Sequence, residues 1–113
     1  RLRDIPKDVT LASDSAALVY FRTGHDVLRL PSYIDPDVGT PDPDYRAERA
    51  KTIAALATAP SLLIGVQPSS DFSVHADAFA AAAHLTLVRR AHHITIWAGP
   101  KTDPALLARI RKG

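Results

Sequence analysis

A length of 113 residues, with 46% hydrophobic and 23% charged residues, fits one globular domain over residues 1–113 and excludes a disordered chain. The absence of cysteine excludes a disulfide scaffold and a zinc–thiolate site. The net charge of +2 is too mild to indicate nucleic-acid binding, and no apolar stretch approaches the roughly 18 residues of a membrane span.

The first thirty residues predict a strand, a helix and a second strand. Residues 8–14 form a short apolar segment after a turn, which indicates a strand. Residues 15–23 predict a helix with Leu18 and Phe21 on its apolar side, followed by Gly24 in the place of a left-handed C-cap. Residues 26–31 predict the second strand.

The middle of the chain predicts a long loop, a helix and a buried strand. Residues 32–44 hold three prolines and four aspartates, which is typical of a loop. A helix is expected from Asp42 to about residue 59. Its expected apolar stripe consists of Ala47, Ala50, Ile53, Ala54 and Ala57. The nearly continuous apolar run at residues 61–68 predicts a central strand covered on both faces.

The remaining residues predict a helix, a hairpin and a C-terminal helix. A third helix is expected over residues 73–83. Its expected buried stripe consists of Phe72, Ala76, Phe79, Ala80 and Ala83. The segments LTLVRR and HITIWAG alternate polar with apolar residues across a short gap, which predicts a β-hairpin. Asp103 and Pro104 are a helix start, so a C-terminal helix is expected after them.

The order βαβαβαββ predicts an α/β fold with helices on both faces of the sheet. We expect a Rossmann-like three-layer αβα sandwich with a mostly parallel five-stranded sheet. The expected strand order is 2-1-3-4-5, with the last strand as an antiparallel edge and residues 62–66 in the middle.

The sequence argues against the common cofactor sites of such sheets. The first strand–helix turn, ASDSAAL, has no glycine to let backbone amides approach a phosphate, and no GxxxxGK[ST] motif is present. The pattern of a phosphoacceptor receiver domain is also missing. The five histidines include no pair at i, i+4 spacing, so we expect no metal and no cofactor.

Two features carry minor hypotheses. RRAHH, at residues 89–93, is expected at the hairpin tip, either as a solvated turn or as a contact to phosphate groups. Trp97 is expected to pack at the sheet or to stack on a sugar.

The segment IPKDVTLASDSAALVYFRTGHDVLRLPS, with PDYRAE after it, resembles the C-terminal extracytoplasmic domain of multi-pass bacterial glycosyltransferases. These are membrane enzymes of the GT-C type that use polyprenyl-phosphate sugars, best represented in actinobacterial envelopes. The family wording is P-x-D-x-x-x-A-S-D-x-P-A-L-V-Y-x-x-T-G-R. It is matched at Pro6, Asp8, Ala12, Ser13, Asp14, Ala17, Leu18, Val19, Tyr20, Thr23 and Gly24. The chain departs from it at His25, where Arg is usual, and at Ser15-Ala16, where a proline is common.

The resemblance implies that the chain is a segment of a larger membrane protein, as the absence of methionine also suggests. The transmembrane portion of the same polypeptide is then its first partner, and the domain lies on the extracytoplasmic, periplasmic side of the cell membrane. The family's catalytic carboxylate lies in a loop near the first membrane helices, so this segment is expected to be non-catalytic alone.

Three functions are open at this point. The first is an accessory domain that positions an acceptor glycan or a lipid-linked sugar at the carboxyl edge of the sheet. Its candidate binding residues are Asp14, Ser15, Tyr33, Tyr45, Gln67, Ser69 and Asp71. The second is an interaction or fold-stabilising module without a ligand. The third, ranked last, is a free-standing enzyme. For Asp14, Ser15, Ser69 and Asp71, helix capping and turn formation are an alternative role.

Overall fold

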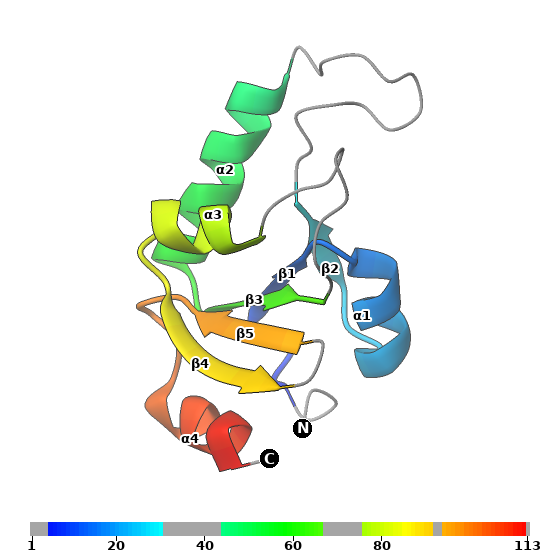
Figure 1. Cartoon of the computed structure of the whole chain (residues 1–113), viewed down its shortest axis with the longest axis vertical. Coiled ribbons are helices and arrows are strands. Elements are labelled where there is room, and N and C mark those ends of the chain that lie inside the picture. The colour runs from blue at the N-terminus through cyan, green and yellow to red at the C-terminus, as the bar shows by residue number, and fades with distance from the viewer. Residues whose placement is uncertain (1–4, 31–43, 67–75, 92–93, 113) are drawn as a thin grey trace.

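The computed structural model describes residues 5–30, 44–66, 76–91 and 94–112 (Figure 1). The elements follow the predicted order. They are β1 (Thr10–Ser13), α1 (Ala16–Thr23), β2 (Val27–Arg29), α2 (Tyr45–Thr58), β3 (Ser61–Gly65), α3 (Ala76–Ala82), β4 (Thr86–Ala91), β5 (Ile94–Ala98) and α4 (Pro104–Lys112). The α/β class, the C-terminal hairpin and the C-terminal helix are thereby confirmed. The predicted loop at residues 32–44 lies almost entirely outside the described residues.

The sheet order is β2-β1-β3-β5-β4, so the expected order 2-1-3-4-5 is wrong. β1 pairs with β2 and β3 in parallel, whereas β5 is antiparallel to both β3 and β4. The sheet is therefore mixed, and β5 is an interior strand rather than the edge. The burial of the two hairpin strands agrees with this order, because Ile96 and Ala98 of β5 are buried whereas β4 exposes most of its residues. β4 also carries Arg89, Arg90 and a bulge, which are typical of an edge strand.

β3 is the central strand, as its apolar run predicted. Its residues Ser61 to Ile64 are fully buried, because they lie between β1 and β5 and under helices on both faces. Leu62 and Ile64 belong to one hydrophobic cluster, and Leu63 belongs to the other. This alternation places one helix pair on each face of the sheet.

The two clusters define the layers. Val19 of α1 and Leu106 and Ile110 of α4 pack on the face of Leu62. Leu56 of α2 and Phe79 of α3 pack on the face of Leu63. The chain is therefore a three-layer domain with α1 and α4 below the sheet and α2 and α3 above it (Figure 1).

One predicted helix face is wrong, one is partly right and one is confirmed. In α1 Val19 is buried, whereas Phe21 is 83% exposed and Tyr20 is 51% exposed; the Leu18 side chain lies outside the described part of the structure. In α2 Leu56 is buried and Ile53 and Ala57 of the predicted stripe are half-buried, but the alanines at 47, 50 and 54 are exposed. A leucine buries more apolar area than an alanine, so the helix turns that side to the sheet. In α3 the predicted stripe is buried at Ala76, Phe79, Ala80 and Ala83; Phe72 lies outside the described residues.

α2 touches the sheet mainly with its C-terminal half. Ile53 and Leu56 pack into the upper cluster, and the Arg49 guanidinium lies 5.8 Å from the centre of the Phe79 ring. A helix of 14 residues is about 21 Å long, whereas β3 with five residues spans only about 16 Å. The N-terminal end of α2 therefore extends beyond the carboxyl edge of the sheet (Figure 1).

Candidate functional site

The carboxyl ends of β1 and β3 meet at Asp14. Its Oδ1 accepts a hydrogen bond of 3.0 Å from the Val66 N–H, 52 positions along the chain. Just before it, the fully buried Ser13 uses its Oγ to accept a hydrogen bond of 3.0 Å from the Ser15 N–H. The turn ASDS is therefore held by its own side chains, and Asp14 joins the ends of two strands.

This position is the topological switch point of the parallel part of the sheet. The chain leaves β1 through α1 below the sheet to reach β2, and it returns through α2 above the sheet to reach β3. The two crossovers diverge between β1 and β3, which is the place where open α/β sheets bind ligands. Asp14 and Ser15 lie at that place.

Among the described residues, Asp14 and Ser15 keep hydrogen-bonding capacity that their contacts within the fold do not take up. Ser15 is the N-cap residue of α1, but its hydroxyl makes no capping hydrogen bond. The hydrogen bond to the Val66 amide uses only one carboxylate oxygen of Asp14, and a carboxylate can accept several. Both residues are partly exposed, so an external hydroxyl can reach them.

The predicted site is only partly within the described residues. Asp14 and Ser15, neighbours in the sequence, lie between β1 and α1, and Tyr45 is the half-buried first residue of α2. Tyr33, Gln67, Ser69 and Asp71 lie outside the described residues. The hydrogen bond from the Val66 amide was not anticipated, because its partners are far apart in the sequence.

Two open clefts lie at the opposite, amino edge of the sheet. One, of about 360 Å³, lies between residues 7–11, residues 25–28 and Ala55. The other, of about 260 Å³, lies between the segment before β1 and the start of α4, and Lys101 and Arg109 contribute to its lining. Asp8 and Val9 line both. Sequence reasoning missed this edge, since no motif marks it.

His25 connects the ends of two segments beside the first cleft. Its Nε2 lies 3.0 Å from the Pro6 carbonyl oxygen, and its Nδ1 lies 3.3 Å from the Asp26 carbonyl oxygen. A carbonyl oxygen can only accept, so each of these contacts is a hydrogen bond when the ring nitrogen that makes it carries the proton, and the contact to Pro6 is the shorter of the two. The histidine at which the chain departs from the family wording therefore ties the turn after α1 to the segment before β1.

Within residues 5–30, 44–66, 76–91 and 94–112, no group of three or more His, Cys, Asp or Glu side chains is arranged to hold a metal ion. In the same residues, no helix combines the length and the apolar character required to cross a bilayer.

Comparisons of this chain with profiles of known protein families, with curated proteins and with solved structures find no match.

Proposed function

We propose that the chain is a non-catalytic accessory domain of a membrane glycosyltransferase that assembles envelope glycan from polyprenyl-phosphate sugars. Its role is to position an acceptor glycan or a lipid-linked sugar on the extracytoplasmic side. The observation that carries this proposal is the position of Asp14 and Ser15 at the switch point, with unused polar capacity there.

The chemistry of this edge suits a sugar. A sugar hydroxyl donates to a carboxylate oxygen and exchanges hydrogen bonds with a serine hydroxyl, and Asp14 and Ser15 offer these groups side by side. Aromatic faces complete many such sites, and Tyr45 supplies one on the portion of α2 that extends past the edge. The other proposed contacts are Tyr33, Gln67, Ser69 and Asp71, which lie outside the described residues.

The fold also gives a reason to place catalysis elsewhere. Asp14 lies at the switch point, and its carboxylate accepts a hydrogen bond from the Val66 amide, which connects the ends of two strands. A residue with this role is suited to binding and positioning. We therefore assign the bond-breaking step to the membrane portion of the parent enzyme, as the resemblance implies.

The test is an amide NMR titration of the 113-residue chain with envelope oligosaccharides and with sugar phosphates. Shifts concentrated at Asp14, Ser15 and Val66 support the proposal. Asp14→Asn keeps an acceptor for the Val66 amide, and Ser15→Ala removes no capping hydrogen bond from α1. Either is expected to weaken binding, whereas Asp26→Asn, at the amino edge, is the matched control and leaves binding unchanged. A chain that shows no shift with any of these sugars contradicts the proposal.

One observation favours a second function, a protein-interaction module. Tyr20 and Phe21 are large and exposed on α1, and their ring centres are 6.2 Å apart in an edge-on arrangement. Exposed aromatic pairs of this kind are common at protein interfaces. Silence in the sugar titration, together with a partner whose binding is lost in Phe21→Ser, would favour this function.

A further inference from the structure

Charge is distributed unevenly along the chain. Residues 84–113 contain six Lys or Arg and one Asp, whereas residues 1–83 contain eight Lys or Arg and eleven Asp or Glu. The last quarter of the molecule is therefore strongly basic, although the whole chain carries only +2. This segment forms β4, β5 and α4.

The fold brings most of these cations to α4 and its borders. Leu106 and Ile110 of α4 are buried against the sheet, which leaves Arg109, Arg111 and Lys112 exposed on the remaining surface of the helix. Arg89 reaches the same place from β4, because its Nη1 donates a hydrogen bond of 3.2 Å to the Ile110 carbonyl oxygen.

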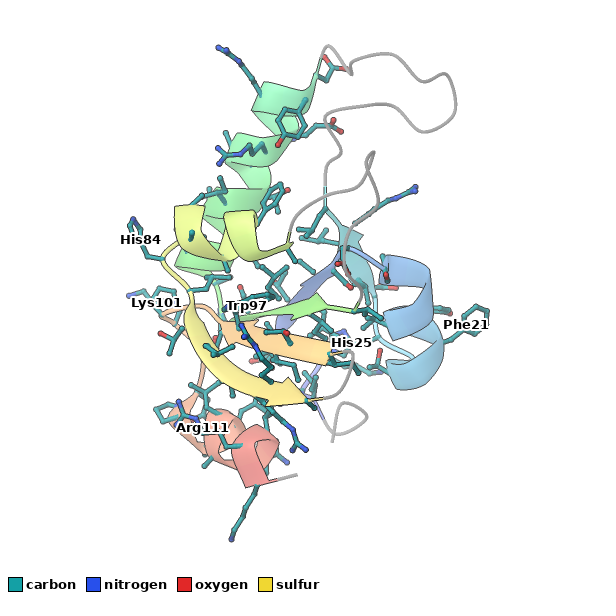
Figure 2. All side chains as sticks on the ribbon, in the orientation of Figure 1. Phe21, His25, His84, Trp97, Lys101 and Arg111 are labelled. Carbon is teal, nitrogen blue, oxygen red and sulfur yellow. The ribbon has the colours of Figure 1, made fainter. Side chains whose placement is uncertain are left out.

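Lys101 extends this surface, since it lines the smaller amino-edge cleft together with Arg109. We call the five cations Arg89, Lys101, Arg109, Arg111 and Lys112 the basic face. Figure 2 shows Lys101 and Arg111 on the side of the molecule opposite Phe21.

Two carboxylates of the described residues border the basic face. Asp8 and Asp103 lie at its border, where they line the same cleft as Lys101 and Arg109. Asp103 is engaged at the start of α4, where its Oδ1 accepts from the Ala105 N–H. The outer surface of the helix beyond it, through Lys112, carries no acidic residue.

The basic face lies beside the start of the chain. Ile5 and Val9 share a hydrophobic cluster with Leu106 and Ile110, and Pro6 lines the cleft that Lys101 borders. Residues 5–9 and α4 are thus neighbours at one end of the molecule (Figure 1). If a membrane span precedes this domain, as the proposed function requires, the basic face is held close to the bilayer.

We propose that the basic face is an electrostatic contact to anionic lipid headgroups of the phosphatidylglycerol or cardiolipin class. Four to eight clustered Lys and Arg are typical of headgroup binding, and the basic face has five. The apolar side of α4 is buried, so the helix lies on the headgroups without inserting. The choice of a membrane over another polyanion rests on the proposed function. The face itself has no aromatic side chain on which a nucleic-acid base could stack.

The test is cosedimentation of the 113-residue chain with vesicles of phosphatidylglycerol and phosphatidylcholine, and with phosphatidylcholine vesicles alone. Binding is expected only to the anionic vesicles and is expected to weaken as salt rises from about 50 to about 300 mM. The triple variant Arg109→Gln, Arg111→Gln, Lys112→Gln should lose at least tenfold in affinity, since each cation near a membrane contributes about fivefold.

The matched control removes the same charge from elsewhere. Arg29→Gln, Arg46→Gln, Lys51→Gln changes three exposed cations on β2 and α2 and should change affinity by less than about threefold. Equal losses in the two triple variants, or no binding to anionic vesicles, overturn the inference. Tighter binding of a single-stranded oligonucleotide than of the vesicles, at the same salt, also overturns it.

A negative result in the vesicle experiment can be told apart from a negative result for the proposed function. The sugar titration reports on Asp14 and Ser15 at the other edge of the sheet, so it can succeed while vesicle binding fails. Conversely, a parent reading frame without hydrophobic spans of roughly 20 residues would contradict the proposed function, whatever the vesicles show.

Discussion

The side chain of Thr102 forms hydrogen bonds with the backbone of Ser61, the first residue of the central strand β3. Its Oγ1 accepts a hydrogen bond of 3.0 Å from the Ser61 N–H and donates one of 2.8 Å to the Ser61 carbonyl oxygen. Both residues are buried, and they are 41 positions apart. The hydroxyl thus supplies the donor and the acceptor that the backbone of a neighbouring strand would supply, at a point beyond the end of β5.

The substitution Thr102→Val keeps the shape of the side chain and removes both hydrogen bonds. The Ser61 carbonyl oxygen retains a second donor, the Gly99 N–H at 2.9 Å, but the Ser61 N–H is left buried without an acceptor. An unpaired buried donor costs about 1–3 kcal/mol, so we expect the free energy of unfolding to fall by about 2 kcal/mol. Thr102→Ser keeps the hydroxyl and loses one methyl group, which costs about 1 kcal/mol.

The assay is urea unfolding followed by far-UV circular dichroism. For a domain of this size, 2 kcal/mol corresponds to a midpoint shift of roughly 1 M urea with the slope unchanged. The valine variant should therefore unfold before the serine variant, and the serine variant should stay closer to the parent. Equal midpoints for the two variants would refute the assignment of the stability to the hydroxyl.

Three further predictions concern backbone geometry and the carboxyl edge, and all use the same urea assay. Gly99→Ala should destabilise by about 3 kcal/mol or prevent folding, because a Cβ there overlaps the Leu56 backbone carbonyl oxygen, which no rotamer change can relieve; a stable, normally folded variant would contradict this. Gly24 and His84 both follow a helix with positive φ, +66° and +55°, a conformation that glycine adopts more easily than other residues. Gly24→Ala should therefore lower the free energy of unfolding by about 1 kcal/mol, and His84→Gly should raise it by up to about 1 kcal/mol. Changes of the same sign would contradict the conformational explanation. Asp14→Ala should cost about 1.5–3 kcal/mol because it leaves the Val66 amide without its acceptor, whereas Asp14→Asn should cost clearly less; the reverse order would refute the structural role given to this hydrogen bond.

The local elements were predictable because their signals are local. Gly24 ends α1 in the left-handed conformation that its place in the sequence indicated, and its amide donates to the Tyr20 carbonyl oxygen. The apolar run of β3 indicated a strand buried on both faces, and its burial is complete from Ser61 to Ile64. These features depend on backbone preference and hydrophobicity over a few residues.

The order of the two hairpin strands in the sheet could not be predicted from the hairpin pattern alone. Two strands joined by a short gap pair with each other in either order, so the sequence predicted the pair but not which strand meets β3. The adjacent Arg89 and Arg90 lie within β4, where two cations are a local signal for an edge strand and not for the tip of the hairpin. The face of α1 was missed for a similar reason: Val19 and Phe21 are both apolar, and only the position of the helix on the sheet decides which is buried.

By itself, the sequence determined the class of the fold, the order of its elements, the central place of β3 and the grouping of Asp14 with Ser15. The tertiary structure decided the exchange of β5 and β4, the hydrogen bonds that join Asp14 to β3 and Thr102 to Ser61, and the basic face of α4. The physical reason is the distance along the sequence over which each effect acts. Propensity and periodicity act between residues a few positions apart, whereas each of these contacts joins segments that only a completed sheet brings together.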